Sequence, residues 1–399
     1  IYTINNITEN KECNLTLKED GPIKKGSLAD YIITTYTSKN AIGTRSDFSS
    51  VFTETNDKIY TTNKTEDGST VYYYAGNTTH NWVKFGKYTS DWYSCSYTSN
   101  ISTIGGYYTM GTSCSYDENA SQYTTKLASK NDDIYWKIIR TNEDGSVRLL
   151  YSGNTPDTTK GYIGMSKYSG ADYVLYTGYM YGTTGSLANN RLNTNSSTIK
   201  QNVDSWYKTN LYNSDYNNYV SKTAIYCNDR SVGSGEWRDE YVSGEDDVNF
   251  RYASDLRIRV GKSPSYKCGV NANNDLIENV QSVEDKFSVS TTNGGNSKLT
   301  YPIALMTIDE VAFAGGVYYT NLASHYAWYF SNSTGGSNTQ TSWWTMTPYY
   351  SNTVNRVWLI DSNGDGYQTY GKITETNINY AMGVRPVISL KSVSYTHLR

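Results

Sequence analysis

Three neighbouring segments decide the fold of this chain: Ser342-Trp-Trp-Thr-Met-Thr-Pro348, Asn355-Arg-Val-Trp-Leu-Ile-Asp-Ser-Asn-Gly-Asp-Gly366 and Gly383-Val-Arg-Pro-Val-Ile-Ser-Leu390. Val354–Ile360 is rich in β-branched, aromatic and aliphatic residues, which is typical of a strand. Ser362–Gly366 supplies residues that tolerate positive φ, so we expect the chain to turn back there into a strand at Tyr367–Tyr370. The segments together predict short antiparallel strands joined by tight turns.

The tryptophan pair Trp343 and Trp344 opens the first of these strands, and Pro348 ends its pairing because proline cannot donate to a ladder. Side chains alternate between the two faces of a strand, so we expect one indole inside and the other outside. A second hairpin is predicted around Asn142–Gly145, where Asp-Gly is a strong turn signal.

Helical spacing occurs at three places. Ser27–Tyr36 predicts a short helix with a serine cap, and Ser196–Leu211 predicts an amphipathic helix that packs Trp206 inward. Thr307–Gly316 predicts a third helix, in which Glu310 completes a capping box and the glycine pair ends the helix. The second and third of these helices, beside short antiparallel strands and long loops, predict an α+β domain rather than an alternating α/β domain.

The composition is that of an extracellular, turn-rich β protein. Charged residues make up only 18% of the 399 residues, while there are 41 tyrosines. A net charge of −3 argues against nucleic-acid binding, because the chain offers no basic stripe to neutralise phosphates. The sequence has no apolar run long enough to span a membrane. We expect an extracellular or cell-surface location.

The five cysteines do not form a zinc motif, since none of them stands in a Cys-x-x-Cys pair. In an exported protein they are expected to form disulfides. We pair Cys95 with Cys114 and Cys227 with Cys268, which leaves Cys13 to pair with a cysteine outside this sequence. Free thiols remain the alternative.

The chain is divided by its composition into three parts. Residues 1–65 are expected to form an N-terminal stalk or linker with a short helix, and residues 66–392 the main domain. Within the domain, residues 86–133 are rich in Tyr, Ser, Thr and Gly and are expected to be a surface insertion. Residues 393–399 resemble a translated sequencing adapter and are expected to contribute nothing to the fold.

Catalytic and metal motifs are mostly absent from the sequence. Asp361–Gly366 matches the first half of a calcium loop, but the position of the bidentate glutamate is Lys372, and a hairpin turn explains the same residues. His80 and His325 have no nucleophile elbow beside them. Arg385 is expected to make a structural ion pair or carbonyl contact. We predict no catalytic residue, no metal and no cofactor.

Seven segments spread over roughly residues 70–390 stand out: the tryptophan pair, the Ser-Asn-Gly hairpin, Gly383–Ile388, Tyr72–Asn77, Trp136–Arg140, Cys227–Ser231 and Tyr301–Leu305. Together they resemble a bacterial surface domain with a C-type-lectin-like fold, of the branch shared with formylglycine-generating enzymes and with the variable proteins of diversity-generating retroelements. This resemblance implies a C-type-lectin-like domain. The enzymes of this branch use a reactive cysteine pair near their C-terminal motif, whereas this chain has no cysteine after Cys268.

In the retroelement-linked members, the ligand face lies between the tryptophan pair and the closing Gly-Val-Arg-Pro. The resemblance therefore places a binding face at residues 349–382, with the residues Tyr349, Tyr350, Asn352, Asn355, Arg356, Trp358, Tyr367, Tyr370, Asn379 and Tyr380. Tyrosine and asparagine suit an adaptable binding face. The leading hypothesis is a non-enzymatic adhesion module on a pilus, lipoprotein or prophage tail fibre that binds a host glycan or surface protein. The alternatives are a structural pilin or stalk domain and an enzyme of the formylglycine-generating type.

Overall fold

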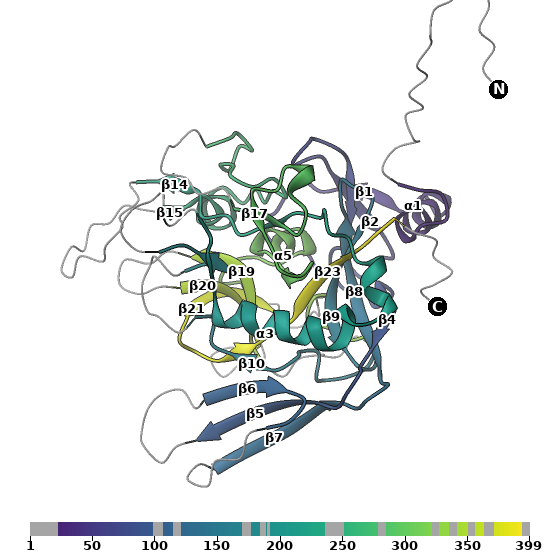
Figure 1. Ribbon diagram of the computed structural model, residues 1–399. Helices are drawn as coiled ribbons and strands as arrows, with labels where there is room; N and C mark the ends of the chain where they lie inside the picture. Colours follow the sequence, from purple (N-terminus) through teal and green to yellow (C-terminus); the bar gives the residue numbers. More distant parts are fainter. Residues whose placement is uncertain are drawn as a thin grey trace, which may run out of the picture.

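The structure is a computed structural model, which describes residues 23–98, 107–114, 121–169, 177–183, 189, 192–235, 251–277, 285–320, 327–334, 341–349, 356–362 and 371–392. It has many short strands in several sheets and few helices (Figure 1), so the predicted α+β class is confirmed. None of the described helices combines the length and the apolar character that a membrane span requires.

The largest sheet contains eight strands, and its order begins with N-terminal strands and ends with C-terminal ones. Along the sheet the strands are β1 (Ile42–Thr44), β2 (Ile59–Thr62), β3 (Val71–Tyr73), β8 (Asp133–Thr141), β9 (Val147–Gly153), β23 (Pro386–Leu390) and β18 (Ala304–Leu305), and β4 (Trp82–Lys87) also pairs with β8. β1 and β2 are parallel and the other pairs are antiparallel. The β8–β9 hairpin turns at Asn142–Gly145, as predicted.

The first strands correct the predicted domain boundary at residue 65. β2 pairs with β3 in the main sheet, and Ile59 is fully buried. Phe48 and Phe52 pack in an aromatic cluster with Phe313, far along the chain. The described residues before 66 therefore belong to the same domain, because their side chains complete its core.

The second sheet holds the tryptophan pair and has five strands. Its order is β10 (Met165–Ser166), β22 (Met382–Gly383), β19 (Trp343–Tyr349), β20 (Arg356–Asp361) and β21 (Lys372–Asn377). β20 and β21 form the expected antiparallel hairpin, in which Ile360 lies opposite Ile373. The predicted strand at Tyr367–Tyr370 lies outside the described residues.

The remaining sheets are small. One contains β6 (Tyr107–Gly111), β5 (Trp92–Thr98) and β7 (Ser121–Ala128), lies within the predicted insertion and projects below the larger sheets in Figure 1. The others are β11 (Met180–Tyr181) with β12 (Asn195–Ser196), β13 (Tyr226–Cys227) with β16 (Lys286–Ser288) and β17 (Ser297–Lys298), and β14 (Val232–Ser234) with β15 (Arg251–Tyr252).

The helices begin where their caps predict. α1 (Leu28–Ser38) and α3 (Thr198–Tyr207) start after serines whose hydroxyl oxygens accept backbone N–H bonds, and α3 continues as a π-turn at Lys208–Tyr212. α5 (Ile308–Ala314) has the full capping box of Thr307 and Glu310 and ends at Gly315, whose φ of +118° favours glycine. Shorter helical turns lie at Asp215–Tyr219, α4 (Ala253–Asp255), Leu256–Val260 and Thr291–Asn293.

Trp343 and Trp344 are both fully buried, so the expectation that one indole faces outward is wrong. β19 lies inside its sheet, paired with both β20 and β22, and packing covers both of its faces. The Trp344 indole donates to the Ser166 carbonyl at 2.8 Å, and the Arg385 guanidinium lies 5.0 Å from the Trp343 ring. Arg385 also donates to backbone carbonyls, among them that of Tyr151, which confirms the predicted carbonyl contact.

Candidate functional site

Two regions can be considered as sites: the predicted binding face and a charged cavity. On the face, the structure describes Tyr349, Arg356, Trp358, Asn379 and Tyr380. The other predicted binding residues lie outside the described part of the chain: Tyr350, Asn352, Asn355, Tyr367 and Tyr370.

Trp358 and Tyr349 do not point outward, which corrects that part of the prediction. Trp358 is 0% exposed, and its ring lies 5.3 Å from the ring of Tyr318 and 4.6 Å from that of Tyr349. The segment after α5 covers this side of the hairpin, because Tyr318 pairs with Ile373 on β21. Trp358 and Tyr349 therefore pack on the buried side of the hairpin, beneath the predicted binding face.

Other predicted residues reach solvent. Tyr380 is 42% exposed, and the half-buried Asn379 follows β21 in the same turn. The Arg356 side chain is 35% exposed and its guanidinium lies 3.1 Å from the Glu375 carboxylate, whose pKa is raised by burial despite this partner. The structure thus keeps three of the five described residues available for contact.

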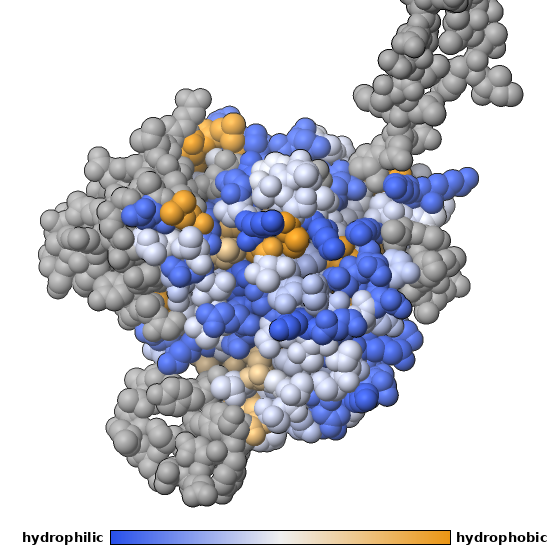
Figure 2. All heavy atoms as spheres, in the orientation of Figure 1, coloured by the Kyte–Doolittle hydropathy of each residue, from blue (hydrophilic) through white to orange (hydrophobic). Residues whose placement is uncertain are grey.

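An exposed aromatic residue beside the same hairpin was not among the predicted binding residues. Tyr319 is 58% exposed, its backbone N–H donates to the Ile373 carbonyl, and the Lys372 ammonium lies 5.0 Å from its ring. The signal was the pair Tyr318-Tyr319, which follows the glycines that end α5 after one valine, but this pair lies outside residues 349–382. Figure 2 shows one side of the molecule, where hydrophilic residues predominate and hydrophobic residues form small separate groups.

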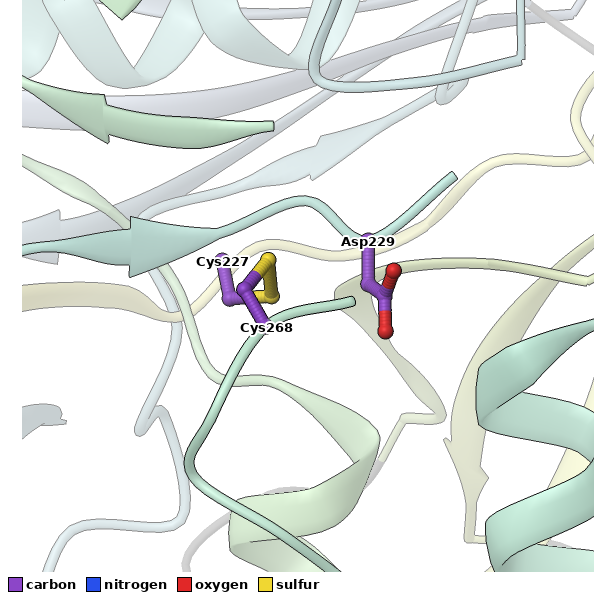
Figure 3. A group of neighbouring side chains, drawn as sticks. All are labelled: Cys227, Asp229 and Cys268. Carbon is purple, nitrogen blue, oxygen red and sulfur yellow. A yellow bond between two sulfur atoms is a disulfide. The ribbon is translucent and has the colours of Figure 1, made fainter. Parts of the chain in front are cut away.

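Cys227, Asp229 and Cys268 form the group of described residues whose ligand atoms lie close enough for a metal ion. Figure 3 shows the two sulfur atoms bonded to each other. The Cα atoms of the two cysteines are 5.7 Å apart. A disulfide offers no thiolate to a metal, so Cys227 and Cys268 form a covalent cross-link rather than part of a metal centre. The predicted pairing of Cys95 with Cys114 is also confirmed, and Cys13 lies outside the described residues.

Next to this disulfide lies a set of buried ion pairs. Arg257 is 1% exposed and holds Asp309 with two hydrogen bonds of 2.9 Å, while it also lies 2.8 Å from Asp229. Arg230 pairs with Asp285 in the same way, at 2.5 Å. Guanidinium groups suit such buried, bidentate contacts.

Glu310 is the centre of a second buried group. Its carboxylate lies 2.7 Å from Arg148 and 3.4 Å from Arg140, and it also accepts the Thr307 backbone N–H of the capping box. Burial alone would raise the pKa of Glu310, but the two guanidinium groups outweigh burial and hold that pKa below its ordinary value. Arg140 reaches a second carboxylate, that of Glu143, at 3.4 Å.

The group around Glu310, together with Asp229 and Asp309, lines a cavity of about 360 Å³, which we call the acidic cavity. It lies between the β8–β9 hairpin, the start of α5 and the disulfide Cys227–Cys268. Its lining consists of Glu66, Asp67, Arg140, Asn142, Glu143, Asp144, Arg148, Thr223, Ala224, Ile225, Cys227, Asp229, Ser265, Tyr266, Thr307, Asp309, Glu310 and Thr347. Cavities of this size hold small molecules.

A family model described as "Domain of unknown function (DUF6273)" matches residues 270–392. The match covers less than half of the chain and includes α5 and every strand of the five-stranded sheet except β10. No curated protein and no solved structure matches the chain.

Proposed function

We propose that this protein is an extracellular, non-enzymatic binding module with a C-type-lectin-like fold, which recognises a host glycan or surface protein through residues 349–382. The observation that carries the proposal is the construction of the β20–β21 hairpin. Buried rings of Trp358 and Tyr349 fix its inner side, while Arg356, Asn379 and Tyr380 remain accessible. A rigid base with adaptable polar and aromatic groups above it suits recognition.

The position of this hairpin also supports the proposal. β20 and β21 lie at the opposite end of the molecule from α1 in Figure 1, so a ligand at the hairpin would be held away from the helix near the N-terminal side. The two disulfides support an oxidising, extracellular setting. They also support a non-enzymatic role, because bonded cysteines cannot act as the reactive pair of the formylglycine-generating enzymes.

The test is a binding screen on glycan and host-protein arrays. The variant Tyr367→Ala/Tyr370→Ala/Tyr380→Ala should lose binding, because aromatic anchors carry much of an interface. Tyr31→Ala on α1, where the wild-type ring is 47% exposed, is the matched control and should bind normally. Unchanged circular dichroism would show that all variants fold.

Unchanged binding by the triple variant would refute the assignment of the face. An absence of binding by the wild type on broad arrays would refute the binding module and favour the structural pilin or stalk.

A further inference from the structure

We propose that the acidic cavity is a second binding site, which takes a small hydroxylated amine. This inference does not depend on the proposed function, because the cavity lies between the β8–β9 hairpin and α5 rather than on residues 349–382. Charge, unpaired polar atoms and carboxylate spacing each support it.

The charge of the lining favours a cation. Seven carboxylates but only two guanidinium groups line the cavity. On the floor the charges are balanced, since Arg140 and Arg148 hold Glu310 and the nearby Arg257 holds two aspartates. At the rim, Asp67 is exposed and Asp144 half-buried, and neither forms an ion pair with another described residue. The rim therefore attracts positive charge into a partly desolvated space.

Unpaired polar atoms in the floor indicate what else the ligand carries. Three residues of the lining carry a buried polar atom that has no hydrogen-bond partner in the described part of the chain: Asn142 Oδ1, Arg148 Nε and Tyr266 Oη. These residues are 5%, 2% and 7% exposed. Buried polar groups are normally hydrogen-bonded, and an unmade bond costs free energy. An ammonium can donate to the Asn142 oxygen, and ligand hydroxyls can accept from Arg148 and Tyr266.

The spacing of the carboxylates favours an organic cation over a metal ion. Among the described residues, the three ligand atoms close enough for a metal ion belong to Cys227, Asp229 and Cys268, where the sulfurs are bonded together. No other three carboxylate, imidazole or thiol groups among the described residues bring their ligand atoms within 4.8 Å of one another. A divalent ion needs several oxygens at about 2.0–2.6 Å, which this spacing does not offer.

The experiment is isothermal titration calorimetry of the full chain at pH 6 with four matched probes: glucosamine, glucose, N-acetylglucosamine and glucuronate. These probes share a ring with hydroxyl groups. At this pH glucosamine is a cation, glucose and N-acetylglucosamine are neutral, and glucuronate is an anion. We expect glucosamine to bind at least tenfold more tightly than each of the other three, and its affinity to fall with added salt.

Two variants test the assigned groups. Asp67→Asn/Asp144→Asn keeps the shape of the rim but removes the two rim charges that form no ion pair among the described residues, and should weaken glucosamine binding at least tenfold. Tyr266→Phe removes only the unpaired hydroxyl, so it should weaken binding severalfold without lowering stability. Asp47→Asn, at an exposed carboxylate elsewhere, is the control and should bind glucosamine as the wild type does.

Equal affinity for glucosamine and glucose, unchanged affinity in both cavity variants, or no glucosamine binding by the wild type would each overturn the proposal. The triple tyrosine variant of the binding face should still bind glucosamine normally. That result separates a failure of this inference from a failure of the proposed function.

Discussion

Replacement of Lys137 by methionine should stabilise the protein, and the gain should depend on pH. Lys137 lies on β8, is 1% exposed, and its ammonium has no hydrogen-bond partner among the described residues. Burial, reinforced by the charge of Arg385 and only partly opposed by Asp157, lowers the pKa of Lys137 from 10.5 to about 7. The native state therefore disfavours a proton that the unfolded chain readily binds.

The size of the stability cost follows from the difference between the pKa of Lys137 in the folded chain and in the unfolded chain. Between pH 7 and pH 10.5 the unfolded chain holds this proton and the folded chain does not, so stability rises with pH in this window. At about 1.4 kcal/mol per pKa unit, the cost at pH 7 is about 4 kcal/mol, and it falls by about 1.5 kcal/mol by pH 8.5. Burial, offset in part by Tyr151, lowers the pKa of Arg385 to about 9, which lies above both pH 7 and pH 8.5, so Arg385 stays mostly charged in this comparison.

The assay is urea denaturation of the wild type and Lys137→Met at pH 7 and pH 8.5, followed by tryptophan fluorescence. The methionine variant should be more stable at pH 7, and its advantage should shrink at pH 8.5. Lys58→Met, at an exposed lysine, is the control. If the advantage of Lys137→Met is the same at both pH values, the reasoning about its buried ammonium is refuted.

Two further predictions concern other buried groups. Glu310→Gln should cost about 3–5 kcal/mol in urea denaturation, because it leaves Arg140 and Arg148 with an uncompensated buried charge. The pKa of Glu310 is below its ordinary 4.5, so this loss should be constant above about pH 5 and disappear as pH falls through the folded value; a constant loss down to acid pH would contradict it. Trp343→Ala and Trp344→Ala should each cost about 3–5 kcal/mol, because both indoles are fully buried, and a neutral effect of either would contradict the packing described for β19.

Local signals in the sequence were sufficient for much of this fold. The capping box of Thr307 and Glu310 involves neighbours in the chain, so it could be predicted without knowing the tertiary structure. The same Glu310 binds Arg148, 162 residues away, and no local pattern indicates that contact. Alternation failed at the pair Trp343 and Trp344 because the rule assumes one solvent face, whereas β19 is covered on both sides. The acidic cavity could not be predicted for the same reason as the contact between Glu310 and Arg148, because its walls come from segments that are distant in the sequence.

The position of β23 has a consequence for biosynthesis. β23 is the last strand of the described domain, yet it lies inside the main sheet, between β9 and β18. Its partner β9 was made more than two hundred residues earlier and presents the backbone groups of Val147–Leu150 to it. While the chain is being translated, that edge therefore lacks its native neighbour until Leu390 has left the ribosome. Native closure of the sheet must follow synthesis of the domain, and until then this exposed edge is the part that a chaperone would most usefully cover.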